Sequence, residues 1–228
     1  MATFVLIHGA GDVGWYWHLV EAELRRRGHD VVAPDLPCED DAAGLSEYAD
    51  VVVSAIGARR DLVVVGQSFG SFTAALVCER LPVRLLVLLA GMVPAPGERP
   101  ADWPEHTGLE AAQREDAALR GPPADTVALF YADLPPALAA EAMRRGRRQA
   151  ATPGQKPWPL RAWTKVPTRF LLCRDDRFFP AAFQRRVVRE RLGIVPDELD
   201  GSHCVALSRP AALAERLESY LAAATGGA

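Results

Sequence analysis

The chain has 228 residues, of which 49% are hydrophobic and 24% charged, and its formal net charge is −3. This length suits one well-buried core and is short for two full domains, so we predict a single domain over residues 1–228. The composition is that of an ordinary soluble globular protein, and the weak negative charge argues against nucleic acid or an anionic membrane as a partner.

Cysteine usage and the start of the chain bear on the compartment. Cys38, Cys78, Cys173 and Cys204 are widely spaced and form no C-x-x-C pair. We therefore expect reduced thiols in a cytoplasmic protein, without a disulfide framework or a metal site. Nothing in the sequence has the character of a signal peptide or the length of a membrane span. Abundant arginine and alanine indicate a GC-rich genome, which fits a bacterial source.

Short apolar runs alternate with helical patterns in the first 92 residues. The apolar runs predict strands at residues 4–7, 30–34, 62–65 and 83–89. Helices are predicted at residues 15–27, 46–57 and 71–81. This alternation predicts an α/β fold with a mostly parallel sheet and helices on both faces.

The rhythm breaks between residues 93 and 167, where prolines crowd the sequence. Short helical patterns at 108–119 and 136–149 interrupt this segment, which predicts a small helical cap inserted at about residues 94–166. Alternation then resumes with a strand at 168–173, a helix at 180–192 and a strand at 195–199. Ser208 is the expected N-cap of the last helix.

Gly66-Gln67-Ser68-Phe69-Gly70 joins the third predicted strand to the helix that follows it. A G-x-S-x-G sequence between a strand and a helix is typical of a nucleophile elbow, a sharp turn that exposes the serine hydroxyl above the sheet. The flanking glycines are expected where neighbouring backbone leaves no room for a side chain. The sequence thus predicts Ser68 as a nucleophile.

A serine nucleophile needs a base, and the base needs an acid that orients it. In this type of architecture the acid follows a strand beyond the cap, and the base lies after the last strand. Asp175 and Asp176 occupy the first place, and His203 occupies the second.

Taken together, these motifs resemble the α/β-hydrolase superfamily over essentially the whole chain. They are His8-Gly9 after the first strand, the elbow at Ser68, the D-x-x-x-P at residues 176–180 and the G-x-H at His203. The spacing to Pro180 in such proteins implies Asp176, rather than Asp175, as the acid. The resemblance also implies an oxyanion hole formed by the backbone N–H groups of Phe69 and Ala10.

Residues 8–17 are similar to the branch of that superfamily that holds methylesterases and hydroxynitrile lyases. Its lyases carry a threonine at the position of Gly9 and a lysine at the position of Cys204. Because both residues differ here, the resemblance favours an esterase over such a lyase.

We therefore expect a serine hydrolase that cleaves a small or medium carboxylic ester through an acyl-enzyme intermediate, without metal or organic cofactor. Three alternatives remain open: the same triad acting on a lactone, thioester or amide or in acyl transfer, a hydroxynitrile-lyase-type reaction, and a receptor that binds a small molecule without turnover. Trp103, His106 and Trp158 in the cap are candidate substrate contacts. The expected partner is a small ester-like molecule, and the oligomeric state, including a homodimer, stays open.

Overall fold

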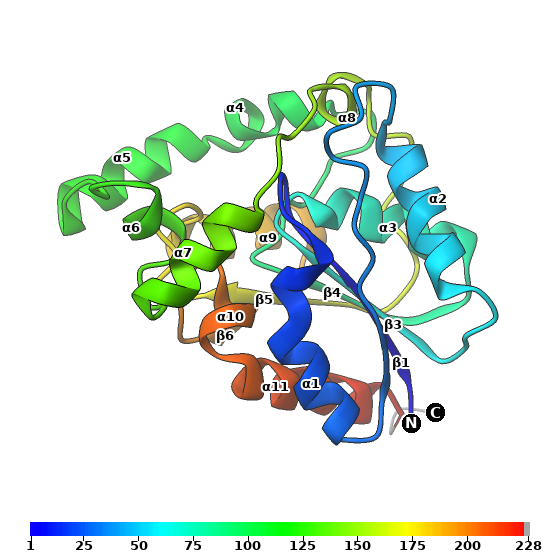
Figure 1. Cartoon of the computed structure of the whole chain (residues 1–228). Helices are drawn as coiled ribbons and strands as arrows, with labels where there is room; N and C mark the ends of the chain where they lie inside the picture. Colours follow the sequence, from blue (N-terminus) through cyan, green and yellow to red (C-terminus); the bar gives the residue numbers. More distant parts are fainter. Residues whose placement is uncertain (226–228) are drawn as a thin grey trace.

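The computed structural model describes residues 1–225, which form one sheet of six parallel strands in the order β2-β1-β3-β4-β5-β6 (Figure 1). This confirms the predicted fold class. The strands are β1 (Thr3–Ile7), β2 (Asp30–Val32), β3 (Leu62–Gln67), β4 (Val83–Leu89), β5 (Thr168–Cys173) and β6 (Asp197–Leu199).

Helices cover both faces of the sheet because successive side chains of a strand point to opposite sides. In β1, Val5 and Ile7 belong to the core shared with α2, α3 and α9, whereas Phe4 and Leu6 belong to the core shared with α1 and α11. The bounds of these helices are α1 (His18–Arg26), α2 (Leu45–Ile56), α3 (Gly70–Arg80), α9 (Ala181–Leu192), α10 (Val205–Ser208) and α11 (Pro210–Thr225).

A helical segment separates β4 from β5, although these strands are neighbours in the sheet. Its elements lie at the end of the sheet away from the N-terminus, mostly in green in Figure 1. They are η2 (Pro100–Asp102), α4 (Trp103–Thr107), α5 (Leu109–Arg120), α6 (Thr126–Phe130), α7 (Pro136–Arg145) and α8 (Thr152–Gln155).

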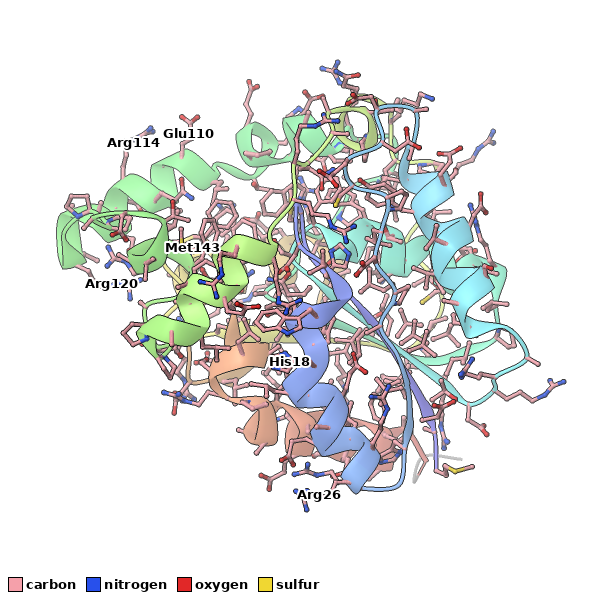
Figure 2. All side chains as sticks on the ribbon, in the orientation of Figure 1. His18, Arg26, Glu110, Arg114, Arg120 and Met143 are labelled. Carbon is pink, nitrogen blue, oxygen red and sulfur yellow. The ribbon has the colours of Figure 1, made fainter. Side chains whose placement is uncertain are left out.

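The outer surface of this segment is polar. Glu110 and Arg114 on α5 point away from the body of the molecule and form an ion pair (Figure 2). Two large hydrophobic side chains are exceptions: Leu119 on α5 is 86% exposed, and Met143 on α7 is 48% exposed.

Two predicted helices differ from those observed. The helix predicted at residues 15–27 is two elements. The first is a 3₁₀ turn, η1 (Gly14–Trp17), and α1 follows from His18. Helix α7 ends at Arg145 rather than at residue 149, because the backbone beyond Gly146 turns towards the loop after β1.

The predicted N-cap at Ser208 is also wrong. Ser208 is the last residue of α10, and its hydroxyl oxygen is buried without a hydrogen-bond partner among the described residues. Helix α11 begins two residues later at Pro210, whose fixed φ suits the first turn of a helix. Within residues 1–225, none of the helices is long and apolar enough to cross a membrane.

Candidate active site

Ser68 lies at the sharp turn between β3 and α3. Its φ of +51° is in the left-handed region, which is costly for a residue with a side chain. Two backbone hydrogen bonds hold the turn: Ser68 N–H donates to the Leu89 carbonyl over 3.1 Å, and Met92 N–H donates to the Ser68 carbonyl over 3.1 Å. The predicted elbow geometry is therefore confirmed.

The glycines on either side of this turn are sterically required. A Cβ at Gly70 would lie 2.4 Å from the carbonyl oxygen of His8, which is backbone and cannot move aside easily. A Cβ at Gly66 would lie 2.7 Å from the Cβ of Ala74 and 2.9 Å from the Cα of Ser71. Both positions need glycine, as the sequence predicted, because helix α3 and strand β1 pack directly against the elbow.

His203 and Asp176 meet in a buried hydrogen bond, 2.7 Å between Nδ1 of the imidazole and Oδ2 of the carboxylate. The other carboxylate oxygen, Oδ1, accepts the N–H groups of Phe178 and Phe179, each over 2.8 Å. Asp176 is fully buried, and its carboxylate is fixed by three donors. Such an acid holds the imidazole in the tautomer that leaves Nε2 free to accept a proton.

Asp175 has different surroundings. It is exposed, and its carboxylate Oδ2 accepts the N–H of Gly201 over 3.2 Å instead of contacting the imidazole. The structure thus brings Asp176, and not Asp175, to His203.

Three phenylalanines pack edge-on around the imidazole. The ring centroids of Phe130, Phe178 and Phe179 lie 5.5, 5.3 and 5.2 Å from that of His203. Phe130 comes from α6 of the inserted segment, and the other two follow Asp176 in the chain. This apolar wall limits the access of water to the His203–Asp176 pair.

Ser68 and His203 line one cavity of about 230 Å³. Its floor includes Gly9, Ala10 and Gln67, so the elbow and the loop after β1 face the same space. Its remaining wall comes from Asp12, Thr126, Phe130, Tyr131, Phe178 and Cys204.

The two residues predicted to form the oxyanion hole lie in the loop after β1 and at the start of α3. Ala10 lines the cavity, and Phe69 is the N-cap residue of α3, where the first N–H groups of a helix have no acceptor within it. The loop that carries Ala10 is held at Gly11, whose N–H donates to Gln149 Oε1 over 3.0 Å and whose carbonyl accepts Arg147 N–H over 2.7 Å.

His8 fixes the start of the same loop. Its Nδ1 contacts the Gly9 carbonyl at 2.9 Å, and its Nε2 accepts the N–H of Leu36 over 3.0 Å. Burial lowers the pKa of His8 to about 4, so the ring is neutral near neutral pH. It joins the loop after β1 to the loop after β2.

The three cap residues predicted to contact substrate lie elsewhere. The buried indole of Trp103 donates to the Val93 carbonyl over 2.8 Å, and the buried indole of Trp158 donates to the Phe72 carbonyl over 3.3 Å. Trp103 and Trp158 anchor the inserted segment to the rest of the fold. His106 pairs with Glu98 at 2.9 Å and leaves about half of its side chain in solvent. None of the three lines the cavity that holds Ser68.

The prediction missed five residues of the cavity wall: Asp12, Thr126, Phe130, Tyr131 and Phe178. Phe178 lies two residues after Asp176, and Asp12 lies two residues after Ala10. Because both are close in sequence to predicted site residues, they could have been included as candidates. Phe130 and Tyr131 carried no such signal in the sequence.

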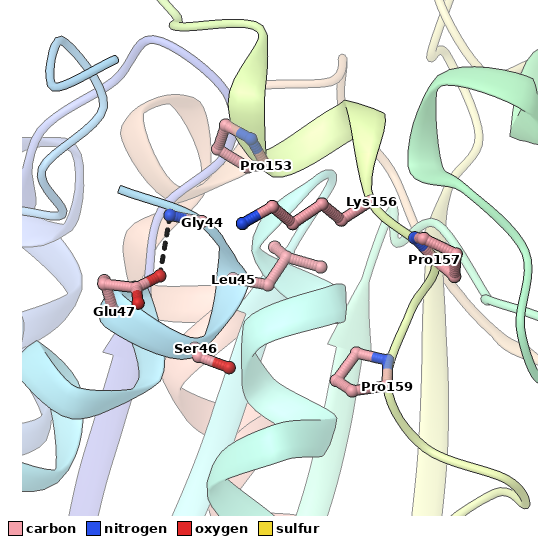
Figure 3. Close-up of a pocket in the computed structure, with 8 residues that line it drawn as sticks. All are labelled: Gly44, Leu45, Ser46, Glu47, Pro153, Lys156, Pro157 and Pro159. Carbon is pink, nitrogen blue, oxygen red and sulfur yellow. Dashed lines mark hydrogen bonds between the residues drawn. The ribbon is translucent and has the colours of Figure 1, made fainter. Parts of the chain in front are cut away.

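A second cavity, of about 180 Å³, lies between the start of α2 and the segment around α8 (Figure 3). Lys156 reaches along it towards Gly44, whose N–H donates to Glu47 Oε2 over 2.8 Å. It has no histidine beside its Ser46, so it lacks the nucleophile and base of the first cavity. Across residues 1–225, no group of three or more His, Cys, Asp or Glu side chains is arranged to hold a metal ion.

Comparison with known proteins gives matches over nearly the whole chain. The model of the alpha/beta hydrolase family matches residues 4–216. Norfluorocurarine synthase 1 of a Strychnos species is 25% identical, covering 94% of this chain and 93% of that protein. Probable esterase PIR7A of Oryza sativa is 28% identical, covering 94% of both.

Among solved structures, polyneuridine aldehyde esterase superposes with a TM-score of 0.80 at 20% identity, covering 96% of this chain and 99% of that one. A likeness at this identity concerns the fold alone.

Proposed function

Because the chain belongs to the alpha/beta hydrolase family, we propose that it is a serine esterase whose nucleophile is Ser68. The observation that carries this proposal is that Ser68 and His203 line the same cavity, while His203 also forms a hydrogen bond with the buried Asp176. Relatives with esterase in their names cover most of the chain and support the same reaction class.

The reaction has two halves. In the first, Ser68 Oγ attacks the ester carbonyl carbon while His203 Nε2 takes the hydroxyl proton. The imidazolium then gives that proton to the alkoxide as the C–O bond breaks, which leaves an acyl-serine and a free alcohol. In the second, water attacks the acyl-serine, His203 removes its proton and returns it to Ser68, and the carboxylic acid leaves.

Negative charge develops on the carbonyl oxygen in both halves. The N–H groups of Phe69 and Ala10 would donate to it, one from the start of α3 and the other from the loop after β1. Asp176 stays ionised and stabilises the imidazolium.

The size of the cavity bears on the substrate. About 230 Å³ is less than the roughly 300–1,000 Å³ of a pocket for a drug-sized ligand. The substrate that fits is therefore a small ester.

Two features disfavour the hydroxynitrile-lyase-type reaction. A Cβ at Gly9 would lie 2.4 Å from Gln67 Oε1, so a threonine there would require Gln67 to move. Burial raises the pKa of the Cys204 thiol, so this position holds a neutral group that cannot stabilise an anionic leaving group as a cation would.

The proposal is tested with a fluorophosphonate that labels activated serines, followed by intact mass spectrometry and peptide mapping. We expect one rapid addition, at Ser68, on the native protein. His203→Ala should abolish rapid labelling. Ser68→Ala should reduce ester hydrolysis by about four to six orders of magnitude while the protein stays folded.

Ser54→Ala is the matched control, because Ser54 is an exposed serine on α2, away from the cavity. It should label and turn over as the native protein does. Absence of labelling on folded native protein would contradict the esterase proposal and favour a ligand-binding receptor. Labelling without hydrolysis of simple esters would direct screening to lactones, thioesters and amides.

A further inference from the structure

The wall of the Ser68 cavity carries a carboxylate that the proposed reaction does not use. Asp12 lies in the loop after β1, two residues beyond Ala10, and its side chain lines the same cavity as Ser68 and His203. It is partly buried and is one of the residues that line this cavity.

Few protein groups stabilise the negative charge of the Asp12 carboxylate. Its Oδ1 accepts the N–H of Val13 over 2.8 Å. In the part of the chain that the structure describes, no arginine, lysine or histidine nitrogen forms an ion pair with it. Burial raises the pKa of Asp12 to about 6, although the Val13 N–H and nearby His203 act in the opposite direction. The group is therefore mainly anionic near neutral pH.

The neighbours of Asp12 favour a cation in the space in front of it. Phe130, Tyr131 and Phe178 present aromatic rings to the same cavity. Burial raises the pKa of the Tyr131 phenol, so that ring stays uncharged. A carboxylate beside aromatic rings attracts cationic amines, through the charge on one side and through the negative ring faces on the other.

We propose that Asp12 binds a cationic amine group of the substrate, so that the preferred substrate of the site is a small ester bearing a quaternary or protonated amine. The proposal rests on the esterase function proposed above. An occupying cation removes the cost of an unpaired, partly buried carboxylate, and it also orients the ester relative to Ser68.

The main competing role for Asp12 is indirect. Asp12 is close enough to His203 to influence it, so its charge would also favour the imidazolium that forms during catalysis. That role acts on every ester alike, charged or neutral. Only a substrate subsite discriminates between esters that differ in charge alone.

The test uses two pairs of esters that match in shape and differ in one atom. Acetylcholine and 3,3-dimethylbutyl acetate place the quaternary nitrogen or its carbon counterpart in the alcohol part. Betaine methyl ester and methyl 3,3-dimethylbutanoate place them in the acyl part. The charge is permanent, so the protonation state of the substrate does not vary.

Asp12→Asn removes the charge but keeps a carbonyl oxygen that can accept the Val13 N–H. Asp40→Asn is the matched control: the Asp40 carboxylate also accepts one backbone N–H, that of Ala42 over 2.8 Å, but it is exposed and does not line the cavity. Both variants change the net charge equally.

We expect the native protein to prefer the cationic member of at least one pair. In Asp12→Asn, kcat/KM for that cationic ester should fall about 10- to 100-fold more than kcat/KM for its neutral counterpart. Asp40→Asn should keep the native ratio. Equal losses for both members of each pair would overturn the proposal and assign Asp12 to His203 instead.

Binding separates failure of this proposal from failure of the esterase function. Ser68→Ala binds the esters without cleaving them, so dissociation constants can be measured by calorimetry with and without Asp12→Asn. If the native protein hydrolyses none of the four esters, the esterase proposal fails for these substrates, and weaker binding of a cationic ester to the double variant still supports the subsite. Equal binding of charged and neutral esters to Ser68→Ala would overturn the subsite by itself.

Discussion

Asp175 and Asp176 are neighbours in the chain with opposite environments. Asp176 is fully buried against the imidazole, and Asp175 is exposed at a distance from it. We expect Asp176→Asn to lower kcat about 10⁴-fold, because an amide no longer enforces the tautomer that accepts the serine proton.

Asp175→Asn is the matched control for that change, since it alters the same residue type one position earlier. Its kcat should stay within about twofold of the native value, because an amide oxygen at this exposed position can still accept the Gly201 N–H. Steady-state kinetics on any cleaved ester checks both. A larger loss in Asp175→Asn than in Asp176→Asn would reverse the assignment of the acid.

The unpaired charge of Asp12 also has a consequence for stability. Its pKa is raised from 3.8 to about 6 on folding, so the folded protein binds the proton more tightly than the unfolded chain. The free energy of unfolding therefore decreases as pH rises from about 4 to 6 and stays lower above that range. With about 1.4 kcal/mol per tenfold change in proton affinity, this loss is at most about 2–3 kcal/mol.

We expect Asp12→Asn to have a higher melting temperature than the native protein near neutral pH, with the difference vanishing below about pH 4. Thermal unfolding of both proteins across this range measures it. The exposed Asp40→Asn should show no such pH-dependent difference. An Asp12→Asn protein that is less stable at neutral pH would mean that the native carboxylate has a cationic partner.

At the residue level, the sequence selected three residues that the structure brings to one site, with Ser68 and His203 lining one cavity and Asp176 bound to His203. Each follows a predicted strand, but the G-x-S-x-G motif was needed to select Ser68, and the resemblance was needed to select Asp176 over Asp175. The prediction that Trp103 and Trp158 contact substrate was not supported by their positions. A tryptophan in a cap gives the same sequence pattern whether its ring packs inward or faces a ligand.

At the level of elements, the loop after β1 depends on a segment far away in the chain. Gln149, just beyond α7, accepts the Gly11 N–H through Oε1 and contacts the Tyr48 hydroxyl through Nε2 at 3.0 Å. Since Ala10 precedes Gly11, this side chain positions one of the two proposed oxyanion donors.

We expect Gln149→Ala to lower kcat about 10- to 100-fold with little change in KM for a small ester, because a small displacement of the donor weakens the transition state more than the ground state. The rate of fluorophosphonate labelling should fall in parallel. Gln149→Glu keeps an acceptor for Gly11 and should recover part of the activity.

Gln155→Ala is the control for this series, because Gln155 is exposed on α8. It should keep native kcat and KM. A Gln149→Ala protein with raised KM and unchanged kcat would show that Gln149 contributes to binding of the substrate and not to the oxyanion hole.

Elements with continuous apolar runs were the easiest to predict. The predicted bounds of β4 and β5 match the observed ones. The end of α7 was missed because the stop signal at Gly146 was not used, and beyond it Arg147 and Arg148 make contacts with residues far away in the chain, including Gly11 and Asp41. Long-range contacts of this kind leave no periodic signal in the sequence.

At the scale of the whole molecule, the site combines three parts of the chain. The β1 loop and the elbow come from the first 70 residues, the aromatic wall partly from the insertion, and Asp176 and His203 from the final quarter. The alternating pattern of the sequence predicted the parallel sheet and the helices that connect its strands. The shape of the cavity did not, because it depends on how the insertion packs over the strand ends.

The insertion between β4 and β5 also delays the completion of the proposed site during biosynthesis. The strands β1 to β4 and the Ser68 elbow emerge first, and β5 pairs with β4 only after all the intervening helices have been made. His203 follows Ser68 by roughly 135 residues, which take about 7–27 s to synthesise at a translation rate of about 5–20 residues per second. During that interval the nascent chain carries the proposed nucleophile without its proposed base.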